Sequence, residues 1–133
     1  MLSNSPAHLL VVDDDAVIVA VFRRICAGLS VRLTVATTYR EGLAVLDRER
    51  PALVISDYRL PDGDGLSLVE KARERYPGLH CVLHTGEAVH RTAYGLDVPV
   101  LSKPCSVDEL QAVVGTVLKS AQGSGAHGPV EVQ

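Results

Sequence analysis

Short apolar runs alternate along this chain with stretches in which apolar residues recur at helical spacing. The apolar runs, each of a length suited to one strand, lie at 9–12, 33–36, 52–56, 81–84 and 98–101. The helical stretches lie at 18–29, 39–46, 66–76 and 110–118, with only a weak helical signal between Gly86 and Val98. Alternation of this kind is typical of βαβ units. The pattern predicts an α/β fold whose doubly wound, five-stranded parallel sheet has helices on both faces.

Proline and capping residues refine this prediction. Pro99 lies in the fifth apolar run, where it removes a backbone hydrogen-bond donor, so we expect this strand at an edge of the sheet. Thr38 with Glu41, and Ser106 with Glu109, have the spacing of a capping box. These pairs predict where the second and the last helix begin.

Length and composition suit a single small domain. With 133 residues, 47% of them apolar, the chain can bury a hydrophobic core and needs no disulfide or structural metal to stabilise it. We expect the domain to cover residues 8–121, with a disordered N-terminus at 1–7 and a flexible tail at 122–133 that contains Gly and Ser. The net charge of −3 gives no whole-chain signal for binding nucleic acid or a membrane surface.

Cysteine usage and the N-terminal sequence predict a cytoplasmic location. The three cysteines form no C-x-x-C pair, which suits buried thiols in a reducing compartment better than disulfides or a zinc site. The N-terminus has no basic segment of a signal peptide, and no apolar run approaches membrane-spanning length.

Polar side chains follow four of the predicted strands at the point where each strand ends. Asp13, Asp14 and Asp15 follow the first strand, and Asp57 follows the third. Thr85 follows the fourth strand and Lys103 the fifth. Ligands of open α/β sheets bind in the crevice beyond the carboxyl ends of the strands, so we expect these groups to face one crevice.

This grouping of charges has a definite chemistry. Two carboxylates about 4 Å apart repel by about 1 kcal/mol in water and about 4 kcal/mol at an effective dielectric constant of 20, so three together need a cation. An all-oxygen set with room for water suits Mg²⁺. Asp57 could then act as a nucleophile toward a phosphoryl group. The ammonium group of Lys103 would bind the negatively charged phosphate oxygens, and Thr85 would offer a hydroxyl donor to them.

In this arrangement the chain resembles the receiver domain of two-component response regulators. The resemblance covers roughly residues 9–121 and depends on motifs in a fixed order: Val12-Asp13-Asp14, Ser56-Asp57 with Pro61 and Asp64-Gly65, Thr85-Gly86, and Lys103-Pro104. It implies a flavodoxin-like sheet in the order 2-1-3-4-5, which agrees with an edge position for the strand that contains Pro99.

The resemblance also implies a role for each site residue. Asp57 is similar to the phosphoacceptor, and Thr85 and Lys103 are similar to the pair that senses the phosphoryl group. Asp14, Asp57 and the backbone carbonyl of Arg59 would bind Mg²⁺, or Mn²⁺ in its place, directly, with Asp13 binding through water. Lys103-Pro104 would be a cis peptide bond, a form seen mainly before proline. Asp15 has no role in this scheme.

The implied partners are those of a signalling domain rather than an enzyme with its own substrate. The phosphoryl donor would be a sensor histidine kinase, a phosphotransfer protein or a small phosphodonor, and the target an unidentified downstream protein. Direct contact with nucleic acid or a membrane is not expected, and a weak homodimer is compatible with the resemblance.

The chain departs from the family pattern at three places. Val100 stands where the family usually has an aromatic residue whose movement reports phosphorylation. The segment from Thr85 to Lys103 is shorter than usual by about one helical turn, which predicts a shortened fourth helix. Cys105 replaces a common phenylalanine, which we interpret as a packing change.

Two further residues should tune the lifetime of the phosphorylated state. Arg59 and Glu87 lie two residues beyond Asp57 and Thr85, so they should flank the phosphoryl site and could pair across it. We hypothesise that this pair hinders the water that hydrolyses the acyl phosphate.

Other interpretations of these residues compete with a phosphorylation site. The first acidic cluster could simply cap a helix, and Asp62 and Asp64 suit turns better than metal ligation. The five histidines lack metal-ligand spacing and are interpreted as strand-end or surface residues.

Other functions known on this type of fold fit these residues less well. A haloacid-dehalogenase-type phosphatase requires a second acid two residues after its nucleophile, and Arg59 occupies that position here. A flavodoxin-like redox protein binds an FMN phosphate, which the acidic first loop of this chain would repel. The open alternative is a pseudo-receiver, a protein-binding module that acts without phosphorylation.

Overall fold

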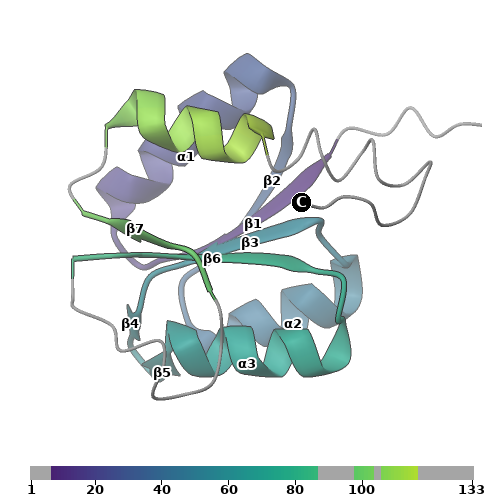
Figure 1. Cartoon of the computed structure of the whole chain (residues 1–133). Coiled ribbons are helices and arrows are strands. Elements are labelled where there is room, and N and C mark those ends of the chain that lie inside the picture. Colours follow the sequence, from purple (N-terminus) through teal and green to yellow (C-terminus); the bar gives the residue numbers. More distant parts are fainter. Residues whose placement is uncertain (1–6, 87–97, 104–105, 117–133) are drawn as a thin grey trace, which may run out of the picture.

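The computed structural model describes residues 7–86, 98–103 and 106–116 of the chain (Figure 1). Several predictions lie outside these residues: the segments 1–6 and 122–133, the shortened fourth helix, Glu87, Cys105 and the bond from Lys103 to Pro104.

Five parallel strands form the central sheet. They are β1 (His8–Val12), β2 (Arg32–Ala36), β3 (Leu53–Ser56), β6 (His80–Thr85) and β7 (Val100–Ser102). Their order is β2-β1-β3-β6-β7, and all four pairings are parallel. Counted along the chain, this is the predicted order 2-1-3-4-5, and the flavodoxin-like fold is confirmed.

The last strand lies at the edge, as predicted from Pro99, but its predicted bounds were wrong. It begins at Val100 rather than Val98, and it ends at Ser102. Pro99 lies just before the strand and joins the sheet only through its carbonyl, which accepts the backbone N–H of Leu83 at 2.9 Å. A residue without an N–H can still accept in this way, so Pro99 precedes the ladder instead of interrupting it.

Four helices of the described part of the chain cover the two faces of the sheet. They are α1 (Ala16–Leu29), α2 (Tyr39–Glu49), α3 (Gly65–Arg75) and a C-terminal helix over residues 107–116, unlabelled in Figure 1. The C-terminal helix lies beside α1 on one face, and α2 and α3 lie on the other (Figure 1).

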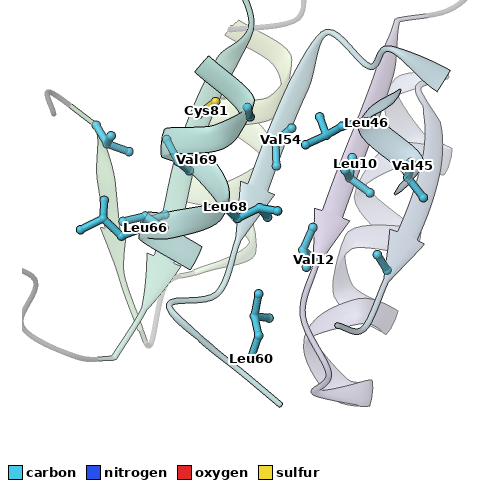
Figure 2. Packing of buried hydrophobic residues seen from close by; sticks show 14 residues of the cluster. Leu10, Val12, Val45, Leu46, Val54, Leu60, Leu66, Leu68, Val69 and Cys81 are labelled. Atoms are coloured by element: carbon cyan, nitrogen blue, oxygen red, sulfur yellow. The ribbon is translucent and has the colours of Figure 1, made fainter. Parts of the chain in front are cut away.

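Strand β1 shows why these apolar runs do not alternate with polar residues. Leu9 and Val11 pack in the core under α1 and the C-terminal helix, whereas Leu10 and Val12 pack in the core under α2 and α3. Figure 2 shows Leu10 and Val12 in this second core, beside Val54 of β3 and the side chains of α2 and α3. Because helices cover both faces, both sets of side chains must be apolar.

Side-chain caps define where the helices begin. Thr38 accepts a hydrogen bond from the backbone N–H of Glu41 at the start of α2, as predicted. The predicted capping box before the C-terminal helix is complete, because Ser106 and Glu109 each accept the other's backbone N–H at 3.0 Å. Asp15 caps α1 and Asp64 caps α3.

Truncation of Phe22 should expose how much the α1 core contributes to stability. Phe22 is fully buried, and we expect Phe22→Ala to lower the free energy of unfolding by about 3–5 kcal/mol, through lost burial and the cavity left behind. Val17, on the same helix, is 69% exposed, so Val17→Ala should change it by less than about 0.5 kcal/mol. Urea unfolding of both variants measures the contrast, and equal losses would contradict it.

Candidate functional site

The pairing of β1 with β3 brings the two acidic segments together. Val12 is opposite Ser56 in the sheet, and the next residue, Asp57, donates its backbone N–H to the carbonyl of Val12 at 2.9 Å. Asp13 and Asp57 therefore leave neighbouring strands at the same edge. Carboxylate oxygens of Asp13, Asp14 and Asp57 all lie within 4.8 Å of one another.

Lys103 brings a positive charge into this cluster. Its backbone N–H donates to the carbonyl of Thr85 at 2.9 Å, which continues the ladder between β6 and β7. Its Nζ atom lies 3.3 Å from Oδ2 of Asp13 and 3.4 Å from Oδ2 of Asp57. The ends of β1, β3 and β7 thus supply one site, in which the ammonium group of Lys103 contacts two carboxylates.

Burial of Asp13 disfavours its charged form. Asp13 is 1% exposed, and burial is the main cause that raises its pKa, with the charge of Asp57 adding to the effect. The backbone N–H of Asp15, at 2.9 Å from Oδ1 of Asp13, and the ammonium of Lys103 act in the opposite direction. Because these donors do not fully offset burial, the cluster would gain from a further cation. The all-oxygen donor set, with Asp14 exposed to water, fits a hard divalent ion such as Mg²⁺.

The backbone around Asp57 is held by short contacts. Its carboxylate accepts the N–H of Tyr58 at 2.7 Å, and its carbonyl accepts the hydroxyl of Ser56 at 2.8 Å. Gly65 closes the loop by donating its N–H to the carbonyl of Tyr58 at 2.7 Å. A Cβ at Gly65 would lie 2.1 Å from the carbonyl oxygen of Asp57, so only glycine allows this approach.

A small antiparallel hairpin follows Asp57, where the sequence indicated only a turn. It pairs β4 (Arg59–Leu60) with β5 (Gly63–Asp64), and Arg59 is opposite Asp64. Two-residue strands are too short to show periodicity, which is why the pattern did not reveal them. Leu60 is buried in the α2–α3 core (Figure 2). Arg59, in contrast, is exposed.

The remaining acids near the site have structural partners. Asp15 caps α1, which agrees with its having no role in the site. Asp64 accepts the N–H of Ser67 at 2.8 Å, and Asp62 accepts those of Tyr39 and Arg40 at 2.6 and 3.0 Å. These bonds agree with the interpretation of Asp62 and Asp64 as structural residues.

Val100 and His84 are two residues whose surroundings only the structure shows. Val100, at the predicted switch position, is half-buried and packs against the α2–α3 core. His84 was predicted at a strand end or the surface; it is near the end of β6, but it is only 2% exposed. Its ring meets Phe22 edge-on at 5.9 Å, and neither ring nitrogen has a hydrogen-bond partner among the described residues. Burial, with a smaller effect of Lys103, lowers the pKa of His84 to about 4.

Comparisons with known proteins identify the family to which this fold belongs. The profile of the response regulator receiver domain matches residues 9–115, and the chain belongs to this family. A CheY-like receiver domain protein of Methanospirillum hungatei JF-1 superposes with a TM-score of 0.81 at 29% identity, covering 91% of this chain and 100% of that one. The receiver domain of a LuxO-type protein of Vibrio parahaemolyticus superposes with a TM-score of 0.83 over 94% and 99% of the two chains; at 20% identity it supports the fold alone.

Curated relatives are longer than this chain. The transcriptional regulatory protein GlrR of Escherichia coli K12 is 32% identical over 90% of this chain and 28% of its own length. The photosynthetic apparatus regulatory protein RegA of Rhodobacter capsulatus is 33% identical over 80% of this chain and 60% of its own length. The chain therefore spans less than two thirds of the length of each of these two relatives. Among its described helices, none has the length and apolar character needed to cross a membrane.

The buried His84 should make stability fall in mild acid. Its ordinary pKa of 6.5 applies in the unfolded chain, whereas its pKa is about 4 in the folded protein. As the pH falls, the unfolded state therefore binds the proton first. Above pH 6.5 His84 does not lower the free energy of unfolding, and between pH 6.5 and pH 4 this free energy falls by roughly 3 kcal/mol in total.

Urea unfolding between pH 7.5 and 4 measures this loss. His84→Leu should flatten the profile of unfolding free energy against pH in this window, because it removes the imidazole that takes up the proton. The carboxylates are common to both proteins, so their effect cancels in the comparison. Parallel profiles for the two proteins would contradict the assignment.

Proposed function

We propose that this chain is a phosphorylatable receiver domain of two-component signal transduction, with Asp57 as the phosphoacceptor. The observation that carries the proposal is the contact of the Lys103 ammonium with both Asp13 and Asp57 inside a cluster of three carboxylates. A carboxylate that could act as the nucleophile, a cation that could bind phosphoryl oxygens and oxygen atoms that could hold a metal lie within a few ångströms of one another. This is what phosphoryl transfer to a carboxylate requires.

The metal site would use the oxygen atoms at this edge of the sheet. Asp14, Asp57 and the backbone carbonyl of Arg59 would hold Mg²⁺, or Mn²⁺ in its place, and Asp13 would bind it through water. When bound, the ion would offset the negative charge of the three carboxylates and of the phosphoryl oxygens. Asp13, the most buried of the three acids, would gain most from this charge.

In the proposed reaction, a carboxylate oxygen of Asp57 attacks the phosphorus of a phosphohistidine on a sensor histidine kinase or phosphotransfer protein. The P–O bond of an acyl phosphate forms, the P–N bond breaks, and the imidazole leaves with the electron pair of that bond. The Nζ atom of Lys103 is already 3.4 Å from Oδ2 of Asp57, so the ammonium group could bind the phosphoryl oxygens once the phosphoryl group is attached there. Thr85, at the end of β6, would supply a hydroxyl donor to the same group.

The output would be a conformational change read by a partner protein. Val100 cannot provide the aromatic movement common in the family, because its side chain has no ring. A different element must therefore report the state of Asp57. Relatives such as GlrR are transcriptional regulators, so control of transcription in the cytoplasm is a candidate output. A weak homodimer would be one way to deliver it.

The second candidate is a pseudo-receiver, which would bind its partner whether or not Asp57 carries a phosphoryl group. Val100 favours it, because the usual switch residue is missing. The contacts of Lys103 with two carboxylates favour the phosphorylatable domain. Burying charged groups costs free energy, and a protein-binding module that is never phosphorylated would gain nothing from this cost.

Mass spectrometry after incubation with acetyl phosphate and Mg²⁺ separates these candidates. The wild-type chain should gain the mass of one phosphoryl group, and Asp57→Ala should gain none, because the nucleophile is gone. Chelation of the metal should abolish the gain as well. No gain in the wild type, together with no Mg²⁺ binding, would favour the pseudo-receiver.

The lifetime of the phosphorylated state tests Arg59 and Glu87. If the two side chains hinder the attacking water, Arg59→Ala and Glu87→Ala should each speed dephosphorylation several-fold, measured as loss of the phosphorylated mass over time. Arg48→Ala is the matched control, because Arg48 is an exposed arginine on α2 that pairs with Glu49. Unchanged rates in both site variants would refute the hypothesis.

A further inference from the structure

The tip of the β4–β5 hairpin docks on the first turn of α2. Asp62, at the tip, accepts the backbone N–H of Tyr39 with Oδ1 at 2.6 Å and that of Arg40 with Oδ2 at 3.0 Å. The first amide groups of a helix have no partner within the helix. The local cap, Thr38, satisfies the N–H of Glu41. Asp62 therefore completes the capping of α2 from a segment more than twenty residues away.

The neighbouring glycine makes a second contact with the same turn. A Cβ at Gly63 would lie 3.0 Å from Cγ and 3.1 Å from Cδ2 of Tyr39, so the hairpin backbone rests directly on the aromatic ring. Hydrogen bonds from Asp62 and close packing at Gly63 are independent contacts. Both hold the hairpin against α2.

The other end of the hairpin leads back to the candidate metal site. Arg59 is opposite Asp64, and Asp64 caps α3 through the N–H of Ser67. Gly65 then bonds to the carbonyl of Tyr58, next to Asp57. The segment between Asp57 and Gly65 is thus a closed loop, tied to α3 and the site at its base and to α2 at its tip.

We propose that Asp62 is a positioning residue for the metal site. By docking the hairpin on α2, it fixes where Arg59 places its backbone carbonyl relative to Asp57, and so sets the affinity for Mg²⁺. The inference rests on the proposed function, and deepens it by assigning a role to a residue outside the set of ligands. Because coupling is reciprocal, Mg²⁺ binding should also tighten the contact between the hairpin and the first turn of α2.

Electrostatics keep Asp62 in the form that this role needs. Desolvation works against the charged form, but the N–H groups of Arg40 and Tyr39 outweigh it and hold the pKa of Asp62 below its usual value. A carboxylate at a helix N-terminus also interacts favourably with the helix dipole. Asp62 therefore accepts both hydrogen bonds as a carboxylate at neutral pH.

The test measures the Mg²⁺ dissociation constant of the full chain by calorimetry for the wild type, Asp62→Ala and Gly63→Ala. Asp62→Ala removes the hydrogen bonds. Gly63→Ala keeps the carboxylate but adds a methyl group 3.0 Å from Cγ of Tyr39, so the hairpin and the ring must move apart by a few tenths of an ångström. Each should weaken Mg²⁺ binding by about tenfold, the effect typical of residues that orient metal ligands. Asp62→Glu, which can restore the carboxylate contacts, should recover part of the affinity.

Asp47→Ala is the matched control. Asp47 is also an exposed acid with two side-chain hydrogen bonds, to Arg75 and Tyr76 at 2.6 Å each, but its partners are on α3 and just after it. Its loss should leave the Mg²⁺ dissociation constant unchanged, even where it lowers the melting temperature. A purely structural role for Asp62 would lower stability in the same way without changing Mg²⁺ affinity.

The outcomes separate this inference from the proposed function. Wild-type affinity in both Asp62→Ala and Gly63→Ala, or an equal loss in Asp47→Ala, overturns the positioning role while the phosphorylation site stands. A wild-type chain that binds no Mg²⁺ overturns both. Should Asp62→Ala fail to fold, Asp62→Asn and Gly63→Ala decide the question. Asp62→Asn keeps the shape of the side chain but removes the charge from its two hydrogen bonds, and Gly63→Ala keeps the carboxylate, so each should still weaken Mg²⁺ binding.

Discussion

The parallel pairing of β1 with β3 is the constraint on which the site depends. It places Asp13 and Asp57 at the ends of adjacent strands, with the N–H of Asp57 bonded to the carbonyl of Val12. Carboxylates brought so close repel one another, and burial of Asp13 adds to the cost. The sheet can hold this arrangement because apolar residues fill both of its faces. The favourable free energy of that burial offsets the local repulsion.

Lys103 offsets part of the repulsion, and its backbone links the acidic cluster to the edge of the sheet. The ammonium contacts the carboxylate of Asp13 at 3.3 Å and that of Asp57 at 3.4 Å. Lys103 also continues the edge strand β7, through its backbone bond to Thr85. Lys103 thus joins the acidic cluster to the edge strand, on which Val100 packs against the α2–α3 core.

The hairpin after Asp57 connects the site to a second region, the N-terminal turn of α2. Glycines make this connection possible in two places: Gly65 approaches the carbonyl of Asp57, and Gly63 approaches the ring of Tyr39. Neither approach tolerates a Cβ without movement. The loop that carries the proposed ligand Arg59 is thus held by backbone packing and by two acids, Asp62 and Asp64, each bound to a helix N-terminus.

The sequence by itself determined the parallel sheet, the edge position of its last strand, the helix starts at Thr38 and Ser106, and the chemical groups at the strand ends. These depend on local periodicity, on capping residues and on proline, which act within a few residues. Only the tertiary structure decided that His84 is buried with no hydrogen-bond partner for its ring among the described residues, that β7 begins after Pro99, that Asp62 caps a distant helix and how closely Lys103 approaches the two acids. Each of these is a contact between segments far apart in the chain, and such contacts leave no pattern in the residues on either side of them.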